Sequence, residues 1–211
     1  MLSHQHKTIF IHVPKTAGQS IETLFLDDLG LNWNQRASLL LRPNTNATLG
    51  PPRLAHLTIT EYLTCGYISR PAFDSYFKFC FVRNPWDRVV SRYQYLAKGS
   101  QSFENFPENG PGNPNSKLAY SFKPQTHYAL DSNSRIQVDF IGKFETLMKD
   151  ISYILTRLQL KADLKHVNPS RTIPDKTKSH NSSYRDFCHK RTKKLVENIY
   201  ASDIEKFGYE F

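Results

Sequence analysis

The residues from Thr8 to Ser20 constrain the fold more than any other part of the sequence. Residues 8–13 (TIFIHV) are apolar and predict a β-strand, residues 14–20 (PKTAGQS) predict a tight turn, and residues 21–29 have the spacing of an amphipathic helix. The first amides of a helix lack partners within the helix and lie at the positive end of its dipole. With Lys15 beside them, these amides predict a binding site for a phosphate ester.

This turn differs from a Walker A loop, in which the Lys follows the second Gly of G-x-x-x-x-G-K-[ST]. Here Lys15 precedes Gly18, the only Gly of the turn. The order of the residues therefore argues against an NTPase or a kinase. Taken alone, the segment is also compatible with an ordinary strand-to-helix turn that carries a surface Lys.

A second strand-to-helix transition follows further along the chain. Residues 76–82 (YFKFCFV) are aromatic and β-branched and predict the clearest strand of the sequence. Asn84 and Pro85 are typical of the N-cap and first position of a helix, which we expect to continue to about Leu96. Arg83 at the strand end and Ser91 two turns along the helix could reach one phosphate, and the planar guanidinium suits such a ligand.

The remaining residues of this helix divide between core and solvent. We expect Val89, Val90 and Tyr93 to face the core, and Arg88 and Arg92 to lie with Ser91 on the other faces.

The segments 14–20 (PKTAGQS) and 81–93 (FVRNPWDRVVSRY) resemble the two phosphate motifs of sulfotransferases that use 3′-phosphoadenosine 5′-phosphosulfate (PAPS), in their carbohydrate branch, family 2. The resemblance extends over nearly the whole chain. It implies that Arg83 and Ser91 bind the 3′-phosphate of the nucleotide and that Lys15 neutralises the leaving group. The residues implied to hold the 5′-phosphate are Lys15, Thr16, Ala17, Gly18, Gln19 and Ser20. It also implies PAPS as co-substrate, a hydroxyl-bearing acceptor on a glycan, and no metal.

His56 is the candidate catalytic base. Residues 53–57 predict a short strand that places His56 at its carboxyl end, where ligands bind in open α/β sheets, and residues 58–61 (TITE) predict a capping box that opens a short helix. A lone His of this kind is also compatible with a buried structural role. The segment resembles the one that carries the catalytic His of heparan 6-O-sulfotransferases, although Tyr62 interrupts the match. We therefore prefer His56 as the base, with His12 and His127 as rivals.

Three polar segments connect these elements. We assign no chemistry to residues 32–52, whereas the resemblance implies an acceptor cleft for residues 98–124 and a nucleotide contact for residues 161–184. Gln125 and His127 are candidates for lining the acceptor cleft. Residues 137–144 predict a further strand, and the apolar stripe of the helix that follows it belongs to the core.

Length and composition predict a single globular domain, residues 1–211, with 39% hydrophobic residues. The alternation of strands and helices predicts an α/β fold, a three-layer domain with a mainly parallel central sheet, and the resemblance implies a P-loop-like sulfotransferase fold. The net charge of +9 suits an anionic partner but does not choose among a nucleotide, a nucleic acid and a membrane surface. Most aromatic residues lie in predicted strands and core stripes, which argues against nucleic-acid binding.

Other features limit cofactors and location. The three cysteines are not spaced as a zinc or disulfide framework, and the sequence offers no ligand cluster for a metal. No apolar run approaches the ~20 residues of a membrane span. The first strand begins within about ten residues of Met1, which leaves no room for a secretory signal and favours a cytoplasmic protein over a shortened form of an anchored enzyme. The alternative function is a basic nucleic-acid- or nucleotide-binding protein without transferase activity. Neither the acceptor nor the oligomeric state can be read from the sequence.

Overall fold

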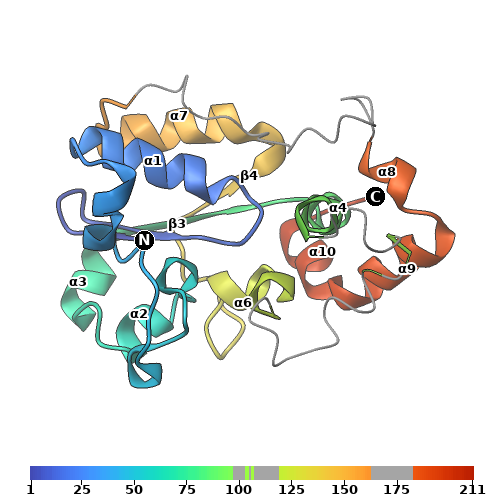
Figure 1. Ribbon diagram of the computed structural model, residues 1–211, viewed down its shortest axis with the longest axis horizontal. Helices are drawn as coiled ribbons and strands as arrows, with labels where there is room; N and C mark the ends of the chain where they lie inside the picture. Colours follow the sequence, from blue (N-terminus) through green and yellow to red (C-terminus); the bar gives the residue numbers. More distant parts are fainter. Residues whose placement is uncertain (97–102, 105, 107–118, 163–182) are drawn as a thin grey trace. The chain divides into compact units, whose positions relative to one another are not determined.

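A computed structural model describes residues 1–96, 103, 104, 106, 119–162 and 183–211 (Figure 1). The chain divides into two compact units. The first unit combines Met1–Val82 with His127–Pro169, and the second combines Arg83–Thr126 with Ser170–Phe211. The single-domain organisation stays a prediction. Among the described residues, no helix has both the length and the apolar character needed to cross a membrane.

The first unit contains a four-stranded, mainly parallel sheet. Its strands are β1 (Leu2–Ser3), β2 (Thr8–Ile11), β3 (Phe77–Val82) and β4 (Phe140–Lys143), and they lie in the order β1-β2-β3-β4. Strand β1 is antiparallel to β2, whereas β2, β3 and β4 run parallel to one another. The expectation of an α/β protein with a mainly parallel sheet is thus confirmed, and β1 is a strand that the sequence reading missed.

Two helices of the first unit, α1 (Gly18–Asp28) and α7 (Leu147–Leu158), cover one face of this sheet (Figure 1). Their apolar residues form one buried cluster with Phe79 and Phe81, which point to the same face because side chains alternate along a strand. The other elements are α2 (Glu61–Thr64), α3 (Arg70–Ser75) and the 3₁₀ turns Trp33–Leu39, Ala47–Leu49, Leu54–His56 and Phe144–Thr146. The expected capping box before α2 is present, since Thr58 N donates to Glu61 Oε2 at 2.7 Å and Glu61 N donates to Thr58 Oγ1 at 3.4 Å.

The predicted strand at residues 53–57 is wrong. Leu54–His56 forms a 3₁₀ turn, and the bridge between Arg53 and Pro43 is isolated and belongs to no strand. Leu54 and Leu57 are both buried. Residues three positions apart lie on the same side of a 3₁₀ turn, whereas in a strand they point to opposite faces. His56 therefore lies on a turn and not at the end of a strand.

The second unit is helical in its described residues. It contains α4 (Pro85–Leu96), the 3₁₀ turn Ala119–Phe122, α8 (Tyr184–Phe187), α9 (Lys190–Ile199) and α10 (Ala201–Phe207); the short helix α6 (Thr126–Ala129) spans the boundary of the units. Trp86, Val89 and Val90 of α4 share a buried cluster with Val196 and Tyr200.

The start of α4 follows the sequence prediction, but the burial of two of its arginines does not. Asn84 Oδ1 accepts hydrogen bonds from the amides of Trp86 at 3.1 Å and Asp87 at 3.3 Å, which confirms the N-cap. Arg88 and Arg92, expected away from the core, are both buried. The reason for Arg88 is that its guanidinium faces Asp203, a residue distant in sequence, at 4.0 Å.

Candidate functional site

The turn between β2 and α1 has the backbone conformation of an anion-binding loop. Lys15 and Ala17 have positive φ angles of 73° and 66°, in the left-handed region that residues with side chains rarely adopt. Thr16 between them is buried, and its Oγ1 donates to Val13 O at 2.8 Å, which holds the turn closed. Where left-handed residues alternate with ordinary ones, successive N–H groups converge on one concavity that accepts an anion. The residues present therefore fit a phosphate ester.

The start of α1 adds to this concavity. Ala17 is the N-cap of α1, and its methyl group cannot accept hydrogen bonds from the first amides as a Ser, Thr or Asp side chain would. Lys15 and Ser20 are half-buried, and Gln19 is exposed. The predicted 5′-phosphate residues thus lie on one continuous turn at the positive end of an 11-residue helix.

Gly18, the first residue of α1, lies directly against the ring of His12. A Cβ atom added to Gly18 would lie 2.0 Å from both Cδ2 and Nε2 of His12, far inside van der Waals contact. Only a residue without a side chain fits at this position while the ring keeps its place.

His12 is itself fixed by the carboxylate of Glu22, a residue of α1. Its Nδ1 donates to Glu22 Oε1 at 2.6 Å, and both residues are buried. The ring also stacks on Phe10 with a centroid separation of 5.7 Å. His12 is therefore an internal part of the loop and a weaker rival for the base than the sequence indicated.

His56 lies beside His12, with ring centroids 4.3 Å apart. Its Nδ1 is 2.9 Å from the backbone oxygen of His12. A carbonyl oxygen only accepts hydrogen bonds, so Nδ1 carries the hydrogen and the lone pair of the neutral ring is on Nε2. This is the tautomer that a general base requires when Nε2 faces the substrate.

Burial lowers the pKa of His56 from 6.5 to about 2, and the charge of His12 adds to this effect, whereas the hydrogen bond to the His12 carbonyl opposes it. His56 is therefore neutral at neutral pH. The other rival, His127, is an exposed residue of α6 whose ring makes an edge contact with Tyr128.

The second predicted phosphate site belongs to the second unit. Arg83 is half-buried, and its Nε lies 2.7 Å from Oδ2 of Asp87, one turn further along. Ser91 is half-buried on α4, two turns after Arg83. That both residues bind a single phosphate stays a prediction.

Other expected site residues differ in their outcome. Gln125 is completely buried and does not line a cleft, which corrects its expected place. Most of the predicted acceptor segment and nearly all of the predicted nucleotide loop at 161–184 lie outside the described residues. Within the parts of the chain that are described, no group of three or more His, Cys, Asp or Glu residues could hold a metal ion.

Comparison with known proteins decides the family. The model described as "Sulfotransferase family" matches residues 1–210. The chain belongs to the sulfotransferase family. The expected resemblance of the chain to this family is thereby confirmed, and no solved structure gives a significant match.

The relatives of this sulfotransferase family member include two carbohydrate sulfotransferases. It is 24% identical over 250 residues to carbohydrate sulfotransferase 11 of Rattus norvegicus, which covers 99% of this chain and 66% of the relative. It is 24% identical over 238 residues to carbohydrate sulfotransferase 9 of Homo sapiens, covering 97% of this chain and 52% of the relative. The chain therefore spans between half and two thirds of their length. An uncharacterized protein of Archaeoglobus fulgidus is 38% identical over 98 residues, or 46% of this chain and 79% of that protein.

Sequence reasoning missed the residues that support the predicted ones. The sequence does contain a pattern that indicates the buried pair of His12 and Glu22. The two residues lie ten positions apart on either side of the phosphate turn, and Glu22 interrupts the apolar side of α1. No local pattern indicates Asp203, whose partners Gln125 and Thr126 are 78 and 77 residues away.

Proposed function

We propose that this protein transfers a sulfuryl group from PAPS to a hydroxyl of a carbohydrate. The observation that carries the proposal is the position of His56, which is held in the Nδ1–H tautomer by the same residue, His12, whose ring packs against the phosphate loop at Gly18. A candidate base and a candidate site for the leaving phosphate are thus joined through one residue. We also infer a P-loop-like, three-layer arrangement, which the passage from β2 through the turn to α1 supports.

The chemistry required is a single displacement at sulfur. The acceptor oxygen forms a bond to sulfur while the bond between sulfur and the 5′-phosphate oxygen breaks, and His56 Nε2 takes the proton of the hydroxyl. Lys15 and the amides of the turn stabilise the charge that develops on the leaving phosphate. The negative charge of a bound donor would raise the pKa of His56 from its low value and strengthen it as a base.

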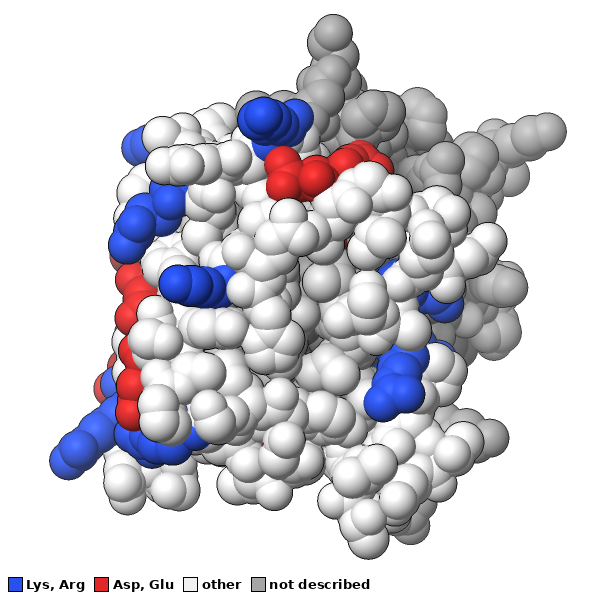
Figure 2. Space-filling view, turned by 90° about the vertical axis from the view of Figure 1, so that its left-hand side faces the viewer, with Lys and Arg blue, Asp and Glu red and all other residues white. Residues whose placement is uncertain are grey.

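The charge distribution bears on the alternative of nucleic-acid binding. Figure 2 shows one face of the molecule, on which the Lys and Arg side chains lie apart and are separated by uncharged and acidic residues. Non-specific nucleic-acid binding uses a continuous basic groove that follows the backbone. The described residues on this face form no such groove, although the net charge is +9.

The direct test is a transfer assay with labelled PAPS and a panel of glycans, lipids and small alcohols. We expect label on a glycan with the wild type and with His4→Ala, a control at an exposed His to which no site role is assigned. We expect a loss of roughly 10²–10⁴ in rate with His56→Ala, the usual contribution of a general base. Binding of the 3′,5′-bisphosphate without transfer to any acceptor would instead identify a nucleotide-binding protein. A preference for oligonucleotides over the bisphosphate would identify a nucleic-acid-binding protein.

A further inference from the structure

The backbone of Arg83 is held by a side chain that sequence reading placed elsewhere. The amide of Gln125 pairs with both polar groups of the Arg83 main chain: Arg83 N donates to Gln125 Oε1 at 2.8 Å, and Gln125 Nε2 donates to Arg83 O at 2.8 Å. Gln125 is 0% exposed. Two hydrogen bonds to one residue fix the orientation of its backbone, because a single bond would still allow rotation.

Gln125 is in turn held by Asp203 of α10. Oδ2 of Asp203 accepts from Gln125 N at 2.8 Å, and Oδ1 accepts from Thr126 N at 2.9 Å and Thr126 Oγ1 at 3.0 Å. Asp203 is completely buried. A buried carboxylate that accepts several N–H bonds forms a rigid anchor, since movement would leave its charge unsatisfied.

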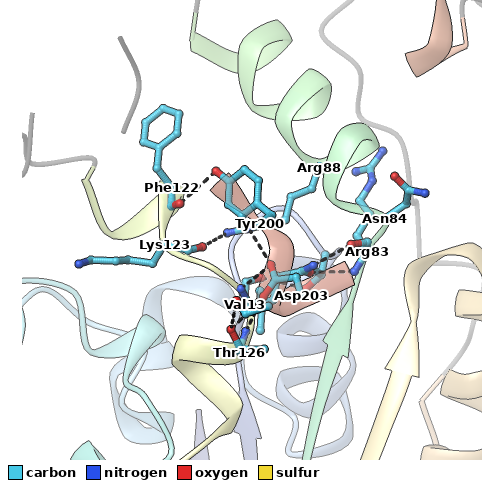
Figure 3. Close-up of polar contacts among 12 residues, drawn as sticks. Val13, Arg83, Asn84, Arg88, Phe122, Lys123, Thr126, Tyr200 and Asp203 are labelled. Carbon is cyan, nitrogen blue, oxygen red and sulfur yellow. Dashed lines mark hydrogen bonds and ion pairs between the residues drawn. The ribbon is translucent and has the colours of Figure 1, made fainter. Parts of the chain in front are cut away.

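Arg88 and Tyr200 fix the preceding residues of the same segment (Figure 3). Arg88 Nη2 donates to the backbone oxygens of Lys123 at 2.9 Å and Ser121 at 3.3 Å, and Tyr200 OH donates to Phe122 O at 3.0 Å. The guanidinium of Arg88 also faces Asp203. The segment that carries Gln125 is therefore attached at several successive residues to α4 and to the helices near the C-terminus.

We propose that Gln125, anchored by Asp203, is a positioning residue for Arg83 and sets the preference of the protein for a 3′,5′-bisphosphate over a 5′-monophosphate. The inference rests on the proposed function, in which Arg83 binds the 3′-phosphate. Two constraints orient the guanidinium: Gln125 fixes its backbone, and Asp87 receives Nε at 2.7 Å. Recognition of a phosphate by an Arg fork depends on this orientation, because its N–H groups have a fixed planar geometry.

The test compares affinities for adenosine 3′,5′-bisphosphate and adenosine 5′-monophosphate, measured by calorimetry on the same preparation. Gln125→Met keeps the length of the side chain and removes both hydrogen bonds to Arg83. We expect the ratio of the two affinities to fall roughly tenfold, the effect of one to two hydrogen bonds of ordinary strength. Partial unfolding of the variant would not change this ratio, because it weakens both apparent affinities by the same factor.

Two further variants complete the test. Gln125→Glu keeps the acceptor for Arg83 N and loses the donor to Arg83 O, so it should fall between the wild type and Gln125→Met. Thr126→Val is the matched control: it removes the hydroxyl bonds to Asp203 and to Ser202, at 3.0 and 3.1 Å, without touching Arg83. We expect Thr126→Val to lower the free energy of unfolding and to leave the ratio unchanged.

The possible results separate the inference from the proposed function. A wild type that binds both nucleotides equally would contradict the proposed 3′-phosphate site itself. A wild type that prefers the bisphosphate, with the same ratio in Gln125→Met, would overturn the positioning role alone. An equal fall of the ratio in Thr126→Val would also overturn it, since the effect would then come from general loosening of the segment.

Discussion

Replacement of Gly18 by Ala tests the packing of the phosphate loop, because two effects of opposite sign compete there. Gly18 begins α1, and Ala stabilises a helix relative to Gly by up to about 1 kcal/mol in its interior. The new Cβ would, however, lie 2.0 Å from two ring atoms of His12. An ordinary contact requires more than an additional ångström, so the ring or the turn must move.

The ring of His12 has little freedom to move. It is held by Glu22 at 2.6 Å and lies against the rings of Phe10 and His56. Overpacking of this kind costs about 1–3 kcal/mol, which exceeds the gain in helix propensity. We therefore expect Gly18→Ala to lower the free energy of unfolding by about 1–2 kcal/mol, measured by urea denaturation.

A double-mutant cycle identifies the cause. In the His12→Ala background the ring is absent, so Gly18→Ala should become neutral or slightly stabilising, and the two substitutions should be non-additive. The reasoning is refuted if Gly18→Ala is as stable as the wild type, or if its cost is the same with and without the ring of His12.

Three further predictions concern the catalytic and phosphate residues. His56→Ala should leave the affinity for the bisphosphate within a few-fold of the wild type while turnover falls, since the base need not touch the nucleotide; binding calorimetry beside the transfer assay checks this. The pKa of His56 is lowered from 6.5 to about 2 on folding. The unfolded chain therefore binds a proton that the folded protein excludes, and stability should fall as the pH drops below 6.5, by up to about 1.4 kcal/mol per pH unit from this group. Denaturation of the wild type and His56→Asn across pH 7 to 5 should show a smaller slope for the variant; equal slopes would contradict the assignment. Arg83→Ala should weaken the bisphosphate by about 1.5–3 kcal/mol and spare the monophosphate, as for loss of a charge-assisted hydrogen bond, and Ser91→Ala should cost less. Equal weakening of both nucleotides would mean that Arg83 supports the fold or the 5′ site instead.

The sequence predicted best what depends on neighbouring residues. The passage from β2 to α1, the N-cap at Asn84 and the capping box of Thr58 and Glu61 are all local patterns, and each is present. Their hydrogen bonds join residues a few positions apart, so residue type and spacing are sufficient to indicate them.

The failures share a different cause. The turn at Leu54–His56 was read as a strand because a short apolar run is compatible with several structures until its buried spacing is known. The burial of Arg88 depends on Asp203, and the burial of Gln125 depends on its hydrogen bonds to Arg83, 42 residues away. Contacts of this range leave no periodic signal in the sequence.

The two predicted phosphate sites also differ in when they can form. The loop around Thr16 is closed by bonds that span 3 and 10 residues, to Val13 and between His12 and Glu22. The hydrogen bonds that support Arg83 join residues much farther apart: 42 positions separate Arg83 from Gln125, and 78 separate Gln125 from Asp203. Because the entropy lost on closing a loop grows with its length, the long-range support should form later in folding and be released earlier when α10 detaches. A partly opened molecule would then retain the predicted 5′-phosphate site while losing the predicted 3′-phosphate site.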